Sequence, residues 1–515
     1  MEPSPWLTIK RGEIMYNALS NNLVVVSNRG AYVFQENNGK INTIRTVSGL
    51  ASAVEPVLLL NGGMWITWGG RLEENNGLSQ GIRLTVPARS SAALPYQVQE
   101  VLLTEEEYNL YYHGFANSCL WPLSHQMLDK CSFDKEFWLA YRQVNHKFAR
   151  VTAQATKNKD FLWVHDYHLT LLPQLVKRYH CQAQVNFFWH IPFPPLDIYR
   201  ALPWGRQLLF GLLGSDFIAF HTQNYVNNFL ACVSHYFPDK YYQKKDEMWF
   251  EQRKIKVQAL PIGINWHRFE KLAAEPKVRA QAEKIRQSLG AEFVLLGIDR
   301  LDYTKGILER MKALEIFLAQ NPAYRGRVTL LQVAVPSRDD LGTYKKLKEE
   351  VEGTVSKING FYDREYQALP IRYLNRSLNE QELVAHYLAA DVLLVTALRD
   401  GLNLIAKEFI ASRLDNHGVL VLSSFAGAAE ELKEALIVNP YHLADIATQI
   451  KNALEMPLIE QAQRLKILRH KVKTHDLRWW WQHNLGAFSP SQVSLPGIRK
   501  VLPGQAISRT ANVKL

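Results

Sequence analysis

Short runs of apolar residues alternate with longer amphipathic stretches along most of the chain, which predicts parallel strands covered by helices. Eight of these runs are rich in Val, Ile, Leu or Phe without alternating polar positions, as expected of strands buried on both faces. They form two series: Leu23–Ser27, Phe161–Val164, Val185–Trp189 and Asp216–Phe220, then Phe293–Ile298, Val328–Val335, Val392–Val395 and Val419–Leu422. The pattern therefore predicts an α/β fold with two parallel sheets.

Helices are predicted between the strands where apolar residues recur at helical spacing, over His168–Tyr179, Ile307–Ala319 and Leu402–Arg413. A polar, charged stretch, Asp239–Lys256, separates the two series of strands. We therefore expect one Rossmann-like domain over residues 1–260 and a second over 261–482. Residues 483–515 lack a clear pattern and contain no acidic residue, so we expect a peripheral tail. Two facing domains of this kind would bind ligands between the C-terminal ends of their sheets.

The composition is that of a globular protein, with 47% of the 515 residues hydrophobic and 21% charged. The chain has no apolar run long enough to span a membrane, and the first twenty residues lack the apolar stretch of a signal peptide. Four scattered cysteines, Cys119, Cys131, Cys181 and Cys232, indicate a reducing compartment and suggest neither a zinc site nor a disulfide framework. We therefore expect a soluble, cytoplasmic protein.

The formal net charge of +11 leaves three kinds of partner open: nucleic acid, membrane surfaces and anionic small molecules. Many of the excess basic residues lie between Arg464 and Arg478, where we interpret them as a solvated helix face. No basic motif interleaved with aromatic residues, typical of nucleic-acid modules, occurs. We therefore expect no nucleic-acid or membrane partner. The oligomeric state stays open, a homo-oligomer included.

The segment from Gly297 to Gly306 begins at the end of a predicted strand and enters a predicted helix. Arg300 and Lys305 would stand at the strand's C-terminal edge, beside free main-chain N–H groups at the helix start. Two cations in this position are typical of a diphosphate site. The other interpretation is a surface loop with an Arg–Asp pair, and spacing alone does not decide between them.

The segment Leu398–Glu408 also follows a predicted strand and opens a helix. Its main-chain amides could cradle a phosphate, Asp400 could bind sugar hydroxyls, and Glu408 could bind both hydroxyls of a ribose. The simpler interpretation makes Asp400 a helix N-cap and Glu408 a solvated charge.

Two more strand ends carry polar residues, in Trp163–His168 and Phe188–Pro195, where Asp166 and His190 lie. Polar side chains beside an apolar strand are costly unless paired or functional, although a single histidine here is often a core residue. Near the N-terminus, Arg29 is accompanied by aromatic residues at Trp68, Tyr112 and Trp121. Rings pack on a pyranose and a guanidinium binds a phosphate, so these residues suit a sugar phosphate.

Taken in order, these motifs resemble those of the trehalose-6-phosphate synthases over roughly residues 22–480. The segments that carry the resemblance are Ser27-Asn28-Arg29, Trp65-Ile66-Thr67-Trp68-Gly69-Gly70, Tyr111-Tyr112-His113-Gly114-Phe115-Ala116-Asn117, Trp163-Val164-His165-Asp166-Tyr167-His168-Leu169, His190-Ile191-Pro192-Phe193-Pro194, Asp299-Arg300-Leu301-Asp302-Tyr303-Thr304-Lys305-Gly306 and Arg399-Asp400-Gly401-Leu402-Asn403-Leu404. The resemblance implies a GT-B fold, in which two Rossmann-like domains face each other, and the transfer of glucose from a nucleotide sugar, UDP-glucose first, to glucose 6-phosphate.

Residue by residue, the resemblance implies three groups. The catalytic group comprises His190, Asp166, Arg300 and Lys305. The donor-binding group comprises Gly49, Arg300, Lys305, Asp400, Gly401, Leu402, Asn403, Leu404, Ile405 and Glu408, and the acceptor-binding group comprises Arg29, Trp68, Tyr112, Trp121, Asp166 and Arg338. It implies no metal ion and no cofactor.

The chain departs from the family pattern at Ser48, which stands where a second glycine usually precedes Leu50, and over residues 30–46 beside the acceptor site. The Ser48 loop approaches the donor phosphates, whereas the departure over residues 30–46 leaves the acceptor open. The alternatives are a glucosylglycerol-phosphate synthase using ADP-glucose and glycerol 3-phosphate, a non-catalytic sugar-phosphate-binding regulator, and a pseudo-glycosyltransferase acting on a cyclitol. The resemblance also implies retention of the anomeric configuration, and no carboxylate pair suggests a two-step displacement.

Overall fold

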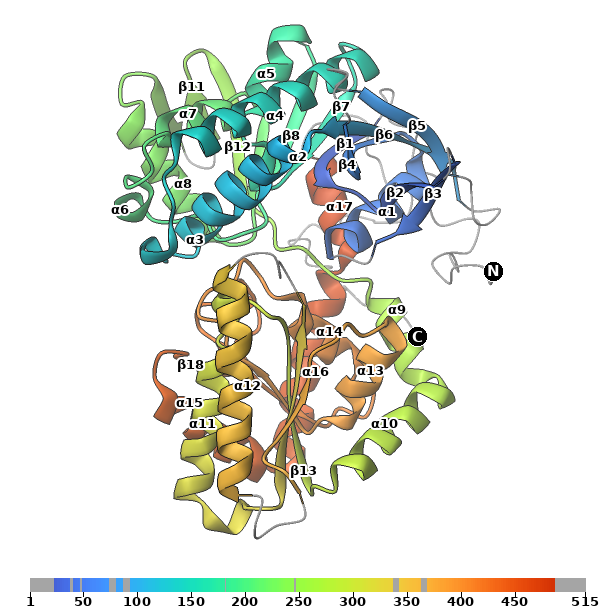
Figure 1. The fold of residues 1–515 in the computed structure, drawn as a ribbon, viewed down its shortest axis with the longest axis vertical. Helices are drawn as coiled ribbons and strands as arrows, with labels where there is room; N and C mark the ends of the chain where they lie inside the picture. The colour runs from blue at the N-terminus through green and yellow to red at the C-terminus, as the bar shows by residue number, and fades with distance from the viewer. Residues whose placement is uncertain are drawn as a thin grey trace, which may run out of the picture.

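The computed structural model describes residues 23–37, 40–46, 49–73, 80–86, 93–180, 182–244, 247–336, 342–362 and 368–486. The described chain forms two lobes, each built around its own sheet, with the sheets covered by helices (Figure 1). The predicted α/β fold with two sheets is confirmed. The division after residue 260 into an acceptor domain and a donor domain stays a prediction.

The first sheet has the strand order β10-β11-β12-β9-β8-β7-β1-β4-β6-β5. Its parallel strands are β1 (Leu23–Arg29), β4 (Met64–Leu72), β6 (Tyr96–Leu103), β7 (Phe161–His165), β8 (Gln184–Phe188), β9 (Phe217–Phe220) and β12 (Arg253–Ala259), and the antiparallel edge strands are β5 (Gln80–Val86), β10 (Tyr241–Lys244) and β11 (Glu247–Phe250). The central strands are apolar and buried, because helices pack on both of their faces.

The helices of this lobe include α1 (Gly49–Asn61), α2 (Glu105–Tyr108), α3 (Trp121–Ser124), α4 (Lys135–Ala155), α5 (Leu172–Tyr179), α6 (Leu196–Tyr199), α7 (Gly205–Leu212) and α8 (Gln223–Tyr236). A wide π-helical segment, Asn109–Leu120, continues α2, and β2 (Tyr32–Asn37) pairs with β3 (Lys40–Arg45) as a hairpin.

Two details of this lobe differ from the sequence pattern. The stretch Asp239–Lys256, which separates the two series of predicted strands, contains β10, β11 and most of β12, and these strands extend the first sheet. The helix predicted over His168–Tyr179 begins only at Leu172, after a short 3₁₀ turn over Tyr167–Leu169. Charged residues at the edge of a sheet leave no apolar run, so the pattern conceals such strands.

The second sheet is entirely parallel, with the order β15-β14-β13-β16-β17-β18. Its strands are β13 (Phe293–Arg300), β14 (Val328–Val335), β15 (Ile371–Leu374), β16 (Val392–Val395), β17 (Val419–Ser423) and β18 (Leu436–Val438). Its helices are α9 (Trp266–Ala274), α10 (Pro276–Leu289), α11 (Ile307–Gln320), α12 (Gly342–Tyr362), α13 (Glu380–Ala389), α14 (Leu404–Ser412), α15 (Leu443–Glu455) and α16 (Leu458–Thr474). The carboxyl ends of β13 and β16 carry the loops that hold the predicted donor ligands.

The chain crosses between the lobes twice, after β12 and again before α17 (Leu477–Gly486), which packs against the first sheet (Figure 1). Trp480 lies 5.0 Å from Trp163 between ring centroids, and Trp481 Nε1 donates to the carbonyl of Ala53. Asn484, at the start of the predicted tail, is fully buried and its carbonyl accepts from Asn186. Residues 483–486 therefore form part of this helix.

The basic stretch between Arg464 and Arg478 is not a purely solvated face, contrary to the prediction. Arg469 Nη1 donates to the carbonyls at the end of α14, including Ile410 and Ala411, and Lys471 pairs with Glu434 at 2.8 Å. No helix in the described part of the chain is long and apolar enough to cross a membrane.

Candidate active site

The loop after β13 places two of the predicted donor ligands at the sheet edge. The strand ends at Arg300, and a 3₁₀ turn over Tyr303–Lys305 leads into α11. The turn is held from within, because the Asp302 carboxylate accepts from the main chain and the hydroxyl of Thr304. Arg300 and Lys305 therefore lie beside the start of a helix, as predicted.

Lys305 and Asp400 form an ion pair that joins the two loops of the second lobe. Lys305 Nζ lies 2.9 Å from Asp400 Oδ2, and the side chains are 8% and 16% exposed. Burial works against ionisation of Asp400, but the ammonium of Lys305 and hydrogen bonds from Lys305 and Asn403 outweigh it, so its pKa lies below the ordinary value. Asp400 is thus held as a carboxylate inside the site.

Asn403 is the N-cap of α14, not Asp400, so the simpler interpretation of Asp400 is wrong. The Asn403 side chain accepts from the main chain of Ala406 at 3.1 Å and donates to Asp400 Oδ2 at 3.2 Å. Its φ of 86° is uncommon for a residue with a side chain. Strain of this kind concentrates at functional sites, where surrounding contacts hold it.

A fully buried network supports the loop after β13 from below. Arg310 on α11 pairs with Asp299 at 2.7 Å and donates to Gln332 and Thr396. The hydroxyl of Thr396 donates in turn to the carbonyl of Gly306, directly after Lys305. The ends of β13, β14 and β16 are therefore fixed relative to the start of α11.

The two lobes meet at this pair of loops. The Tyr225 hydroxyl, on α8 of the first lobe, donates to the Asp400 carbonyl at 3.0 Å. The Arg300 guanidinium lies 5.2 Å from the centroid of the Trp121 ring, which also belongs to the first lobe. The main chain of Gly401 runs so close to that of His190 that a Cβ atom at 401 would lie 2.3 Å from the His190 carbonyl oxygen.

In the first lobe, Arg29 at the end of β1 is surrounded by aromatic rings. Its guanidinium lies 5.2 Å from the centroid of Trp68 and 5.0 Å from that of Tyr112, and it donates to the Tyr108 hydroxyl at 3.1 Å. Tyr112 stacks in turn on His168, with centroids 5.8 Å apart. An arginine lined by rings suits a phosphorylated sugar.

Three histidines lie at the ends of adjacent strands of the first sheet: His165 is the last residue of β7, His190 follows β8 and His221 follows β9, and His165 and His221 are buried. His165 Nδ1 and His190 Nε2 are 3.0 Å apart, and the main-chain N–H of Ile262 donates to His221 Nδ1. Burial lowers the pKa of all three, for His221 to about 3, so they are neutral at physiological pH.

Asp166, one of the predicted acceptor residues, directly follows β7. It adopts a φ of 74°, and its Oδ1 accepts from the main chain of Tyr167 at 3.0 Å and of His190 at 3.3 Å. The carboxylate is therefore tied to the loop that carries His190.

A second part of the site is a cavity of about 190 Å³ between the lobes. Among its lining residues are Gly49, Leu404 and Glu408 from the predicted donor group, together with Arg268 and Glu380. Burial raises the pKa of Glu408 to about 7, with Tyr387 donating to its carboxylate and Glu380 nearby. The interpretation of Glu408 as a solvated charge is wrong.

The structure brings together both loops of the predicted donor group and the aromatic set around Arg29. Leu402 is buried in the core, and Ile405 lies in the first turn of α14. Arg338 and Ser48 lie outside the described residues. The sequence patterns did not indicate Tyr225, Arg268, Glu380, Tyr387 or His125, whose ring lies 4.2 Å from that of Trp121 between centroids. Two of these left a weak signal, since Tyr225 follows the strand end at His221 and His125 follows Trp121.

Among the described residues, no group of three or more His, Cys, Asp or Glu side chains is arranged to hold a metal ion.

Comparison with known proteins agrees with this geometry. The model of glycosyltransferase family 20 matches residues 21–489. A bifunctional trehalose-6-phosphate synthase/phosphatase of Thermoproteus tenax is 39% identical over 471 residues, which cover 89% of this chain and 62% of that protein. A trehalose-6-phosphate synthase of Mycobacterium avium is 36% identical over 484 residues, 92% of this chain and 96% of the relative. The chain thus spans less than two thirds of the first relative and nearly all of the second.

A solved structure of a UDP-forming α,α-trehalose-phosphate synthase from Burkholderia xenovorans, in complex with glucose 6-phosphate, superposes with a TM-score of 0.81. It is 31% identical and covers 91% of this chain and 99% of its own. The two-lobed architecture is therefore the GT-B fold of these enzymes. The chain belongs to glycosyltransferase family 20.

Proposed function

We propose that this protein transfers glucose from UDP-glucose to glucose 6-phosphate, forming trehalose 6-phosphate and UDP. The observation that carries the proposal is the contact between Arg300 and Trp121. Arg300 belongs to the predicted diphosphate ligands and Trp121 to the predicted acceptor ligands, so this contact supports a site in which the departing diphosphate lies beside the acceptor. Relatives support the same substrates, since the Dictyostelium discoideum protein is UDP-forming and the Burkholderia xenovorans structure holds glucose 6-phosphate.

In this proposal the donor is held by the second lobe. Arg300 and Lys305 bind the diphosphate, Asp400 and the main chain of Gly401–Ile405 bind the glucose hydroxyls, and Glu408 binds the ribose. The ion pair supports this role of Asp400. A carboxylate fixed at 2.9 Å from Lys305 keeps its orientation while it accepts hydrogen bonds from the sugar hydroxyls.

The acceptor is held by the first lobe. The proposed ligands of glucose 6-phosphate are Arg29, Trp68, Tyr112, Trp121, Asp166 and Arg338. Arg29 binds the phosphate, since a guanidinium framed by two rings keeps its planar face in place. His190 and Asp166 lie at the reacting face, where the loop after β8 meets Gly401.

The reaction proceeds with retention by attack on the face of the sugar from which UDP leaves. The bond between the anomeric carbon and the β-phosphate oxygen breaks, and a bond to the C1 hydroxyl oxygen of glucose 6-phosphate forms. The proton of that hydroxyl passes to the departing phosphate oxygen. Arg300 and Lys305 stabilise the charge that develops on the diphosphate. The neutral histidines add no competing cation.

The test is nucleotide release with UDP-, ADP- and GDP-glucose, each offered with glucose 6-phosphate or glycerol 3-phosphate. We expect release with UDP-glucose and glucose 6-phosphate, and an α,α-linked disaccharide phosphate by NMR. Arg300→Ala should abolish it. Arg327→Ala should not, because Arg327 is an exposed residue whose contacts are with Glu292, Ala323 and the rings of Phe293 and Tyr324. Release with glycerol 3-phosphate and not with glucose 6-phosphate would refute the proposal.

A further inference from the structure

Tyr387 contacts the proposed ribose ligand from a helix that no motif singled out. It lies in the last turn of α13, its side chain is fully buried, and its hydroxyl donates to Glu408 Oε2 at 2.8 Å. Among the described residues, no other side chain or main-chain group donates a hydrogen bond to the Glu408 carboxylate. The ring packs edge-on against Phe409, the next residue of α14, with centroids 6.2 Å apart.

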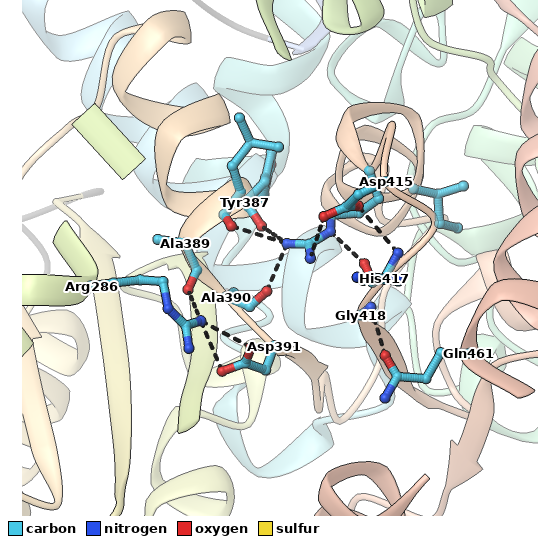
Figure 2. A network of polar contacts seen from close by, with 12 residues as sticks. Arg286, Tyr387, Ala389, Ala390, Asp391, Asp415, His417, Gly418 and Gln461 are labelled. Atoms are coloured by element: carbon cyan, nitrogen blue, oxygen red, sulfur yellow. Dashed lines mark hydrogen bonds and ion pairs between the residues drawn. The ribbon is translucent and has the colours of Figure 1, made fainter. Parts of the chain in front are cut away.

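The main chain of Tyr387 is tied to the same helix, α14. Arg413, directly after α14, donates from Nη1 to the carbonyls of Tyr387 at 3.0 Å, Leu388 at 3.1 Å and Ala390 at 2.8 Å. Figure 2 shows the carbonyls of Tyr387 and Ala390 turned toward one guanidinium group, with Asp415 and His417 on its other side. These bonds satisfy carbonyls that the end of α13 leaves without helical partners. Tyr387 is therefore held at its hydroxyl and at its carbonyl by one neighbouring helix.

A second arginine fixes the end of α13 to the sheet. Arg286 on α10 donates to the carbonyl of Ala389 and to the Asp391 carboxylate, both at 2.9 Å (Figure 2). Asp391 Oδ2 accepts in turn from the main chain of Val294 at the start of β13. The helix end that carries Tyr387 cannot shift without disturbing the central strand, so the hydroxyl is presented from a rigid support.

The charge around Glu408 makes this hydrogen bond important. Burial raises its pKa to about 7, the Glu380 carboxylate adds to the rise, and the Tyr387 hydrogen bond opposes it. The charge of Glu380 is itself compensated, since Arg268 Nε donates to Glu380 Oε2 at 3.1 Å. Tyr387 is therefore the neighbour that favours the ionised carboxylate of Glu408.

We infer that Tyr387 is a positioning residue for donor binding: its hydroxyl holds the Glu408 carboxylate ionised and turned so that it accepts both hydroxyl groups of the donor's ribose. This inference rests on the proposed function, because it takes the donor to be a ribonucleoside diphosphate sugar. Anchoring one carboxylate oxygen leaves the other oxygen able to accept from a ligand in the 190 Å³ cavity that Glu408 lines.

The test separates positioning from a general structural role by removing one ribose hydroxyl. Binding of UDP and of 2′-deoxy-UDP is measured by calorimetry for the wild type and for Tyr387→Phe, which keeps the ring and its packing. We expect the wild type to bind UDP at least about tenfold more tightly than 2′-deoxy-UDP. Tyr387→Phe should weaken the binding of UDP about three- to tenfold and the binding of 2′-deoxy-UDP less than about twofold.

Tyr324→Phe is the matched control, because Tyr324 also donates to a carboxylate, Glu455, but at a distant and exposed place. It should leave both affinities unchanged. Equal weakening of both ligands in Tyr387→Phe, or no weakening of UDP, would overturn the inference.

The dependence on pH gives a second readout that loss of packing would not produce. Without the hydrogen bond the pKa of Glu408 rises above about 7, so UDP binding should weaken at a higher pH on acidification than in the wild type. The ligand's own ionisation is common to both proteins and cancels in the comparison. Coincident pH profiles would overturn the inference. Failure of the proposed function is distinguishable, because it would show as UDP binding without formation of trehalose 6-phosphate.

Discussion

The carbonyl oxygen of His190 lies where the side chain of residue 401 would otherwise stand. A Cβ atom at Gly401 would be 2.3 Å from that oxygen and 3.1 Å from the Cα of Ile191. No flexible side chain can move aside, since both neighbours are main-chain atoms. The absence of a side chain at 401 is thus what lets the two lobes approach this closely.

We expect Gly401→Ala to lower kcat/KM by about 100-fold or more, because a displacement of about 1 Å in a reacting geometry costs that much. Gly353→Ala is the control, since nothing lies within 4 Å of a Cβ atom at that position of α12. It should leave activity unchanged and raise stability slightly, as alanine favours a helix. Steady-state kinetics and thermal unfolding measure both, and wild-type kinetics in Gly401→Ala would contradict the steric argument.

Lys305→Met should lower kcat by about 10²–10³-fold, because it removes a cation from the departing diphosphate. It also leaves the buried Asp400 carboxylate without its ammonium partner, so the melting temperature should fall.

The double variant Lys305→Met/Asp400→Asn tests the origin of the lost stability. Removing the uncompensated charge should recover much of the melting temperature. The value of kcat should stay low, because the variant lacks two proposed donor ligands, and wild-type kcat in it would contradict both assignments.

Arg29→Lys should raise the KM for glucose 6-phosphate by about tenfold and leave UDP binding unchanged. A lysine keeps the charge but loses the planar group that lies over Trp68 and Tyr112. Arg83→Lys is the control on the same lobe, where the guanidinium meets only the Gln99 side chain among the described residues. A change confined to kcat, with KM unaltered, would remove Arg29 from the acceptor site.

The buried histidines predict a loss of stability in mild acid. Burial lowers the pKa of His125 and His221 to about 3, whereas an unfolded histidine titrates near 6.5. Between these values the unfolded chain binds more protons than the folded one, so the free energy of unfolding decreases as the pH falls below about 6.5.

Urea denaturation at several pH values from 5 to 8 measures this slope. His125→Gln should reduce it by up to one proton relative to the wild type, and the difference between the two proteins cancels the contribution of the carboxylates. An unchanged slope would mean that His125 is protonated in the folded protein.

The residue pattern was sufficient for the parts of the site that follow buried strands. Arg300 ends β13, Lys305 and Asp400 lie in the loops that follow β13 and β16, and parallel strands bring their carboxyl ends to one edge. The pattern could not show that Asn403 caps α14 in place of Asp400, because both residue types cap helices equally well. The hydrogen bond from the main-chain N–H of Ala406 to the Asn403 side chain decides between them.

Other features depend on tertiary packing that no local pattern encodes. The hydroxyl of Tyr387 matters because the end of α13 lies against α14, and nothing near Tyr387 in the sequence indicates this. The strands over residues 241–259 carry charged residues on their exposed faces, so they contain no apolar run by which the sequence pattern could identify them. The run Trp479-Trp480-Trp481 predicts burial but not that the helix returns to the first lobe.

The return of α17 fixes how the lobes can move. The two connections pass side by side, since a Cβ atom at Gly263 would lie 2.2 Å from the main chain of Asp476, and Leu477 donates to the Ile264 carbonyl at 3.0 Å. Two adjacent connections form a hinge, so rotation of one lobe about the line through them is the motion that disturbs the fewest contacts. In the proposed reaction, this rotation would bring together the nucleotide sugar on one lobe and the phosphosugar on the other.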